Sequence, residues 1–292
     1  MHDLIERFLD SIQSERHFAA NTVAAYRNDL TQLAAFVENP DDESDCPPIN
    51  DWADLADEHL IAYLVHLGQQ DYASSTVARK TAAMKSFASW LVSEGITEED
   101  AGAHVSSPRV DKYLPKAITP DDVERLLEEP THNSGAKPDS IRDRAMLEIL
   151  YATGMRVSEL VALNVEDVDL DAGTVVCAGR SGRVRTLPLS NRAIDALAKY
   201  LNEARRLMAN DDTDSLFVNH RGGRLTRQGF WLILKSYAAR VGIGQMTPHT
   251  LRHSFAVHAL RRGLDIKDVQ KQLGHVSLST TQVYWHMAQQ PD

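Results

Sequence analysis

The chain contains only two cysteines, Cys46 and Cys177, among its 292 residues. Two cysteines are too few for a disulfide framework or a cysteine-based zinc site, so a reducing cytoplasm is the simplest setting. No apolar run approaches the roughly 18 residues that a membrane span needs. The charged segment from Met1 to Arg7 also lacks the apolar stretch of a secretory signal. We therefore expect a cytoplasmic protein with no membrane partner.

Lysine is the second scarce residue. The chain has 9 lysines against 22 arginines, and no lysine stands between positions 138 and 198.

Internal repeats and low-complexity tracts are lacking as well, which excludes a repeat architecture. The hydrophobic fraction of 43% is ordinary for a protein with buried cores, and the length is sufficient for two domains.

The net charge of −10 argues at first sight against a nucleic-acid partner. The charge is unevenly distributed, however. Residues 1–112 hold 20 acidic and 8 basic side chains, whereas residues 180–271 hold 7 acidic and 17 basic ones. Because binding to phosphate depends on the local electric field, a basic segment can bind nucleic acid in a chain that is acidic overall. We therefore expect residues 180–271 to carry most contacts with a polyanion.

Apolar residues recur at helical spacing through most of the first hundred residues. The segment 38–51 is acidic and contains three prolines, so it is predicted to be a loop. We expect a four-helix N-terminal domain over residues 1–103. Its predicted helices cover residues 3–14, 21–37, 57–70 and 74–94.

Residues 104–115 combine serine, proline and charged positions and are predicted to be an interdomain linker. Residues 116–292 form the predicted C-terminal domain, which is mainly helical with one small antiparallel sheet. Two strands, 174–178 and 184–189, flank a glycine-containing turn. The predicted fold class is therefore mainly α, with a four-helix N-terminal domain and a mixed α/β C-terminal domain.

Arginine and histidine stand in two separated motifs of the C-terminal half, Thr-Gly-Met-Arg and Pro-His-Thr-Leu-Arg-His. Arg156 ends the first motif. In the second, His249 and Arg252 are three residues apart and share one helical face. Two guanidiniums can each donate two hydrogen bonds to phosphate oxygens, which neutralises charge as metal ions do in many nucleases. Arg156 and Arg252 are therefore candidates for binding a phosphate, and His249 is a candidate for proton transfer.

His253 stands four residues after His249, which is the spacing of a helical zinc site. The intervening residues lack the glutamate of the HExxH motif, and Arg252 would oppose a cation on the same face. We therefore predict no metal and no cofactor, and we interpret His253 as a structural hydrogen-bonding residue.

Tyr284 follows His275 of a Leu-Gly-His motif by nine residues and ends the run Ser-Thr-Thr-Gln-Val-Tyr. A phenol is a poor nucleophile unless it is oriented and flanked by positive charge. The two assigned arginines can supply that charge. We therefore predict that Tyr284 is a nucleophile that attacks phosphorus.

These motifs, in this order and spacing, resemble those of the tyrosine recombinases, most closely the Xer branch, over nearly the whole chain. The resemblance implies a SAM-like core-binding domain followed by a catalytic domain of the tyrosine-recombinase type, which together clamp duplex DNA. It implies that Arg156 and Arg252 clamp the scissile phosphate. It also implies that His275 donates a hydrogen bond to the phosphate and that Tyr284 forms a 3′-phosphotyrosyl intermediate. Further candidate DNA contacts are Arg79, Lys80, Lys85, Arg183 and Arg227.

The implied function is site-specific recombination of double-stranded DNA. The partners would be the recombination site and further subunits, as a homo- or hetero-oligomer that forms a tetramer on two DNA sites. Resolution of chromosome dimers and integration or excision of a mobile element use the same chemistry, so both roles stay open.

Two features depart from the family pattern. The resemblance implies a hairpin lysine that protonates the leaving 5′-oxygen, but Arg180 stands there, and arginine hardly releases its proton. Only eight residues follow Tyr284, whereas relatives carry a further C-terminal helix that docks into a neighbouring subunit. Arg180 either supports cleavage electrostatically, or a lysine elsewhere replaces it, or cleavage is slow. The alternatives are a DNA-binding protein of the same fold with weak or no cleavage, and a helical scaffold.

Overall fold

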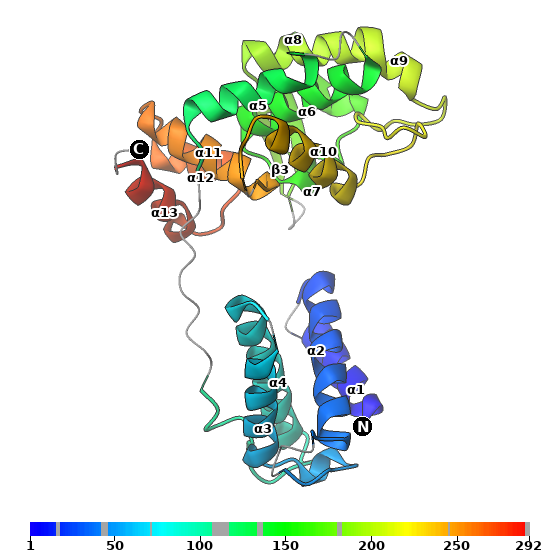
Figure 1. Ribbon diagram of the computed structural model, residues 1–292, viewed down its shortest axis with the longest axis vertical. Coiled ribbons are helices and arrows are strands. Elements are labelled where there is room, and N and C mark those ends of the chain that lie inside the picture. Colours follow the sequence, from blue (N-terminus) through cyan, green and yellow to red (C-terminus); the bar gives the residue numbers. More distant parts are fainter. Residues whose placement is uncertain are drawn as a thin grey trace. The chain divides into compact units, whose positions relative to one another are not determined.

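The computed structural model describes residues 1–15, 18–41, 46–70, 72–106, 117–132, 137–179, 183–244 and 246–289. The chain divides into two compact units, Met1–Tyr113 and Leu114–Asp292 (Figure 1). Most of the predicted linker lies outside the described residues, so the predicted domain bounds stay a prediction.

The first unit is helical, as predicted. Helix α2 packs against the other three helices, and the unit closes around an aromatic core. In that core the ring of Phe87 lies 5.4 Å from Phe8 and 4.9 Å from Trp52, and the Trp52 indole donates to the carbonyl of Met1 over 3.0 Å. The helices are α1 (His2–Ser14), α2 (Ala20–Glu38), α3 (Asp57–Gln69) and α4 (Ser74–Ser93).

One candidate DNA contact in this unit does not fit its surroundings. Lys80 is only 3% exposed, and its ammonium group donates to Asp29 over 3.1 Å and to Gln32 over 2.6 Å. Arg79 pairs with the same carboxylate. A buried carboxylate needs such partners. Lys80 therefore neutralises Asp29 in the interior of the unit, and we withdraw it from the candidate DNA contacts.

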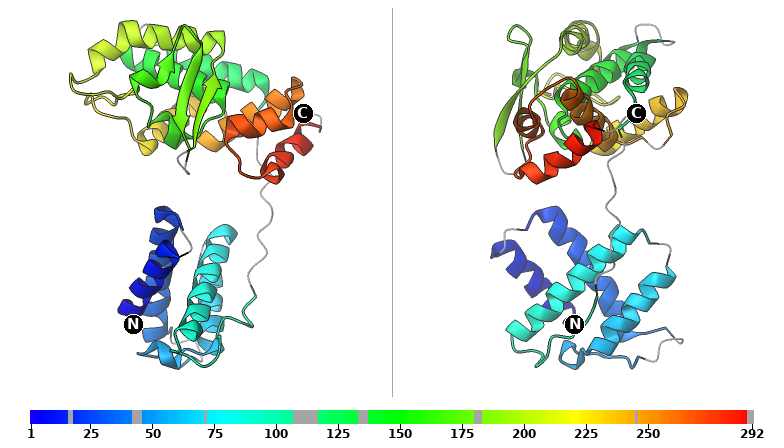
Figure 2. Two further views of the ribbon diagram at one scale, coloured as in Figure 1. Left: turned by 180° about the vertical axis from the view of Figure 1, so that it is seen from behind. Right: turned by 90° about the vertical axis from the view of Figure 1, so that its left-hand side faces the viewer.

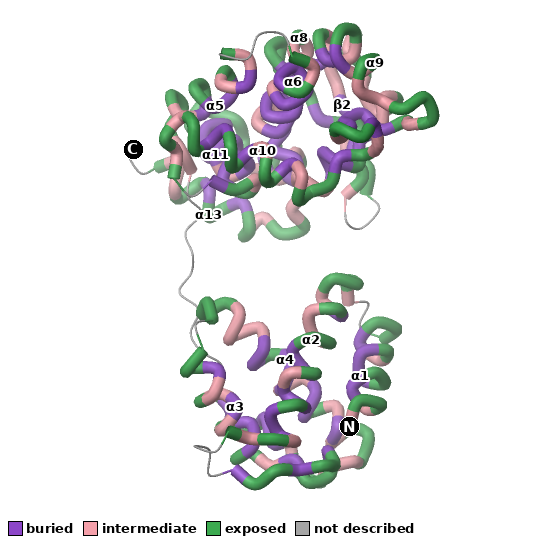
Figure 3. Tube along the Cα trace, turned by 45° about the vertical axis from the view of Figure 1, so that its right-hand side comes forward, coloured by how far each residue is buried: buried purple, intermediate pink, exposed green. Residues whose placement is uncertain are grey.

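The second unit is built around α6 (Pro138–Thr153), which is buried along most of its length (Figure 3). Helices α5, α8 and α11 pack against it. A π-helical turn, Tyr200–Ala204, joins α8 to α9. The other helices are α5 (Pro120–His132), α7 (Val157–Leu160), α8 (Asn191–Lys199), α9 (Arg205–Met208), α10 (Arg227–Arg240), α11 (Pro248–Arg261), α12 (Ile266–Leu273) and α13 (Leu278–Ala288).

A small antiparallel sheet lies along one side of these helices (Figure 2). Its strands are β1 (Val168–Asp169), β2 (Thr174–Ala178) and β3 (Val184–Pro188), in the order β1-β2-β3. Alternate residues of β2 and β3 face the core, as expected for a sheet with one solvated face. The predicted fold class and the two predicted strands are confirmed. The prediction missed β1, because two residues are too few to show an alternating pattern.

Gly154 brings the end of α6 into contact with α11. It adopts a left-handed conformation with φ of 61°, and a Cβ atom there would lie 2.2 Å from the Phe255 ring. Only glycine tolerates both the conformation and the close approach. As a result, Arg156, the N-cap residue of α7, follows only two residues after the point where α6 contacts α11, the helix that carries Arg252.

Candidate active site

Arg252 is the buried cation at the centre of the site. Its side chain on α11 is 4% exposed and donates to the carbonyls of Gly154 (2.7 Å) and Leu273 (2.6 Å). Burial, reinforced by the positive charge of Arg156, lowers the pKa of Arg252 to about 10. Among the described residues no carboxylate forms an ion pair with it. A buried guanidinium whose partners are neutral groups is well prepared for an anionic ligand, because the ligand supplies the missing negative charge.

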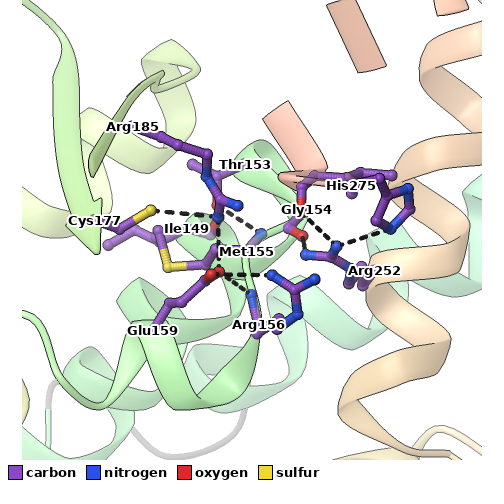
Figure 4. A network of polar contacts seen from close by, with 11 residues as sticks. Ile149, Thr153, Gly154, Met155, Arg156, Glu159, Cys177, Arg185, Arg252 and His275 are labelled. Atoms are coloured by element: carbon purple, nitrogen blue, oxygen red, sulfur yellow. Dashed lines mark hydrogen bonds and ion pairs between the residues drawn. The ribbon is translucent and has the colours of Figure 1, made fainter. Parts of the chain in front are cut away.

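Arg156 is positioned by Glu159, its neighbour on α7. The Glu159 carboxylate accepts the backbone N–H of Arg156 over 2.7 Å and its Nη1 over 3.2 Å. The same carboxylate accepts a bond of 2.8 Å from Nη2 of Arg185, a residue of β3 (Figure 4). Glu159 is 5% exposed, so these bonds are shielded from water. One carboxylate thus orients two guanidiniums, and Arg252 adds a third nearby.

Sequence reasoning did not predict Arg185 as a site residue. Its side chain packs directly over Gly274, where an added Cβ would lie 1.5 Å from its Nη1, and it donates to the Cys177 sulfur over 3.5 Å. The available signal was strand alternation, which puts Arg185 on the same face as the buried Leu187. The glycine of the Leu-Gly-His motif is therefore needed for contact between β3 and the end of α12.

His275 lies between Arg252 and Thr281. Its Nε2 is 3.1 Å from Nη2 of Arg252, and its Nδ1 is 2.9 Å from the Thr281 hydroxyl. Burial, together with Arg252, Arg156 and Arg185, lowers the pKa of His275 to about 4. The ring is therefore neutral at pH 7, with Nε2 accepting from the guanidinium and the proton on Nδ1. Donation to a phosphate, as the resemblance implies, would require the ring to turn or to gain a proton.

Tyr284 is buried on α13, and its hydroxyl is 2.7 Å from Nδ1 of His253. Its ring also stacks near His275, at a centroid distance of 6.1 Å. Burial raises the pKa of Tyr284, whereas Arg252 and Arg156 act to lower it. The phenol is therefore oriented and lies in the field of both arginines, the two conditions that a tyrosine nucleophile needs.

His249 and His253 lie one turn apart on α11, with their rings stacked at 6.2 Å. His253, which the sequence indicated as merely structural, contacts the predicted nucleophile.

Arg180 lies outside the described residues. The structure thus brings Arg156, Arg252, His275 and Tyr284 into one cluster and adds Glu159, Arg185 and His253. No group of three or more potential metal ligands occurs in the described part of the chain.

A cleft of about 530 Å³ opens beside this cluster. Four of its lining residues are basic, namely Arg156, Arg183, Arg185 and Lys271, and none of the described lining residues is acidic. A cleft of this composition concentrates positive potential and favours an anionic ligand.

Comparison with known proteins agrees with this geometry. Residues 116–290 match the phage integrase family, and residues 5–95 match the phage integrase N-terminal SAM-like domain. Because the first match alone spans more than half of the chain, the protein belongs to the phage integrase family.

Three relatives illustrate the similarity. The chain is 50% identical over 290 residues to tyrosine recombinase XerC of Roseiflexus sp. (strain RS-1), with 98% of this chain and 90% of the relative covered. It is 42% identical over 285 residues to tyrosine recombinase XerD of Halalkalibacterium halodurans, with 97% and 92% covered. Among solved structures, the crystal structure of XerA recombinase is 27% identical with a TM-score of 0.54, covering 99% of this chain and 94% of that one. No helix among the described residues is long and apolar enough to span a membrane.

Proposed function

We propose that the chain is a site-specific tyrosine recombinase that cuts and rejoins duplex DNA through a 3′-phosphotyrosyl intermediate. The observation that carries the proposal is the position of Tyr284. Its hydroxyl is buried in a cluster of arginines and histidines whose central guanidinium has no carboxylate partner among the described residues. Family membership and the names of the relatives support the same activity.

The arginines bind and neutralise the phosphate. Arg252 and Arg156 donate to its non-bridging oxygens, where charge accumulates as the pentacoordinate transition state forms. Glu159 fixes the direction of the Arg156 side chain, so little reorganisation is needed when DNA binds. Bond energy is retained in the phosphotyrosyl link, which allows rejoining without a nucleotide cofactor.

Double-stranded DNA is the proposed partner, held by the basic surface of the second unit. Arg183 lines the cleft, and Arg227 is exposed at the start of α10. In the first unit, the Arg79 side chain is 38% exposed, and Lys85 is only partly buried although it donates to the Val105 carbonyl over 2.6 Å. These four side chains stay candidate phosphate contacts.

Recombination joins two DNA sites, so we propose that four subunits act together, as a homo-oligomer or with a second recombinase. Relatives named XerC and XerD support an Xer-type protein. Resolution of chromosome dimers and movement of a mobile element are the two roles that fit. Both act on chromosomal DNA, and we propose the cytoplasm as the location.

The competing function is DNA binding without cleavage, for which the arginine at position 180 is the specific observation. The test begins with a duplex enriched from a random library by binding to this protein, then nicked near the cleavage position so that cleavage cannot be reversed. A covalent protein–DNA adduct supports the recombinase. A mobility shift without an adduct supports the binding protein. The absence of both signals would support a helical scaffold.

A further inference from the structure

The hydroxyl of Tyr284 lies within hydrogen-bonding distance of the His253 side chain. The Oη to Nδ1 distance is 2.7 Å, and the two rings are tilted by 37° at a centroid distance of 5.4 Å. The contact joins α11 to α13, two helices that pack along each other. It brings an imidazole nitrogen next to the hydroxyl proton of Tyr284, which the residue must lose before its oxygen can bond to phosphorus.

The surroundings of His253 keep its ring neutral at pH 7. Burial lowers its pKa to about 4, and the neighbouring His249 and Arg252 act in the same direction. The charged or titratable groups that face it are His249 and Arg252 from its own helix, Tyr284 from α13, and His275, which follows α12. Since the phenol is a donor, Nδ1 is the accepting nitrogen and the ring proton is on Nε2.

We propose that His253 is the base that accepts the proton of Tyr284 during strand cleavage and returns it during rejoining. This inference rests on the proposed recombinase function. In the forward step the O–H bond of Tyr284 breaks and an N–H bond forms at Nδ1, while the phenolate oxygen bonds to phosphorus. The bond from phosphorus to the 5′-oxygen breaks, and that oxygen takes a proton from water or from the Lys271 ammonium in the cleft. Rejoining reverses each transfer.

In the protein without DNA, a ring with a pKa of about 4 is too weak a base to deprotonate the buried phenol, so the base must gain strength when the phosphate binds. The imidazolium would be stabilised only while the phosphate carries its developing negative charge beside Arg252. Proton transfer and attack on phosphorus are therefore coupled, and a free phenolate does not accumulate. His249, to which the sequence assigned proton transfer, stacks on the His253 ring, 6.2 Å away.

The test compares two histidines of α11, each of which contacts the hydroxyl of a tyrosine on another helix. His253→Asn keeps a hydrogen-bond acceptor near the position of Nδ1 but cannot take up a proton at neutral pH. His258→Asn is the matched control, because His258 is also buried on α11 and its Nδ1 lies 2.9 Å from the Tyr151 hydroxyl. With the nicked duplex, His253→Asn should form adduct roughly 100-fold more slowly or worse, with unchanged DNA binding. The control should cleave within about 3-fold of the unsubstituted protein.

Two further measurements separate a base from a structural contact. Added imidazole should restore adduct formation in His253→Ala in proportion to the concentration of neutral imidazole. The rate of His253→Asn should rise about tenfold per pH unit between pH 6 and 8, as hydroxide replaces the lost base, whereas the unsubstituted protein should show a flat profile.

Results that would overturn the role of His253 can be distinguished from those that would overturn the recombinase function. Faster cleavage by His253→Asn would mean that His253 restrains Tyr284, and a loss that imidazole does not rescue and that leaves the pH profile flat would mean a structural role. Either result overturns the proposal but leaves the recombinase standing. If the unsubstituted protein forms no adduct, both proposals fail together.

Discussion

Arg185 and Glu159 are 26 residues apart in the chain, yet their side chains meet over 2.8 Å in the interior of the site. The bond ties the sheet to the turn that carries Arg156, because the same carboxylate also accepts from that arginine. The orientation of Arg156 thus depends on a strand that lies outside the sequence motifs.

Replacing Glu159 should therefore cost both stability and rate. Glu159→Gln leaves the half-buried Arg185 without a counter-ion, for which we expect a loss of about 3 kcal/mol in the free energy of unfolding. Cleavage should fall by roughly 10- to 100-fold as Arg156 loses its fixed direction. Denaturant unfolding and adduct kinetics measure the two effects. The control is Glu124→Gln, which removes an exposed partner of Arg192 and should cost about 1 kcal/mol or less; equal losses in both variants would refute the role of Glu159.

Gly274→Ala should lower stability and cleavage rate through a steric clash with Arg185. A control variant separates the effect of this clash from that of backbone strain. The new Cβ would lie 1.5 Å from Nη1 of Arg185, and φ at position 274 is 64°. Gly242→Ala provides the control, since φ there is 73° but no atom lies within 4 Å of the added Cβ. We expect about 1 kcal/mol of destabilisation in the control from strain alone. Gly274→Ala should lose more stability and at least tenfold in cleavage rate, and matching behaviour of the two variants would contradict the packing described.

Arg252→Ala and Arg156→Ala should each slow cleavage by on the order of 100- to 1,000-fold, because each removes a preorganised donor to the transition state. DNA affinity should change much less. The measurement is adduct formation at saturating protein, alongside the dissociation constant. Equal losses in rate and affinity would make these arginines ordinary phosphate anchors.

The half-buried histidines His253 and His275 should make stability depend on pH. The pKa values of His253 and His275 are lowered to about 4 in the folded protein, against about 6.5 when exposed. Between these values the unfolded chain binds more protons, so stability is complete above about pH 6.5 and decreases as the pH falls towards 4. Thermal unfolding from pH 7 to 4.5 should show this decrease. The double variant His253→Asn/His275→Asn should show a smaller decrease, and an unchanged slope would contradict burial of neutral rings.

DNA binding should weaken steeply with salt, through contacts on the second unit. Arg183→Gln and Arg227→Gln should each reduce the slope of log K against log salt by about 0.9, the value of one phosphate contact. Lys80→Gln should instead lower stability and leave the slope unchanged, because Lys80 is buried against Asp29. A reduced slope for Lys80→Gln would restore it as a DNA contact.

Local pattern was sufficient to predict most of the elements. The motifs, together with the family resemblance, pointed to Arg156, Arg252, His275 and Tyr284, whose catalytic roles stay predictions. Apolar spacing determines where helices form, and the motifs put reactive side chains at their ends. The contacts of Glu159 and Arg185 could not be predicted in this way, because they depend on how a strand and a distant helix pack.

His253 and Lys80 also show that a motif within one helix does not predict contacts with a distant helix. His253 was interpreted as structural, but the packing of α13 on α11 places the Tyr284 hydroxyl on its ring. Lys80 was interpreted as a surface cation, but helix α2 places Asp29 opposite it and both are buried. In each case the partner lies far away in the sequence, and spacing within one helix carries no information about it.

The most direct test of the account is the chemical identity of the covalent link. The nicked duplex is incubated with the protein and with Tyr284→Phe, and trapped adducts are digested and sequenced by mass spectrometry. We expect a 3′-phosphonucleotide on the oxygen of Tyr284 in the unsubstituted protein. For Tyr284→Phe the account predicts no adduct, with DNA affinity nearly unchanged. An adduct formed by Tyr284→Phe, or a link mapped to any other residue, would contradict it.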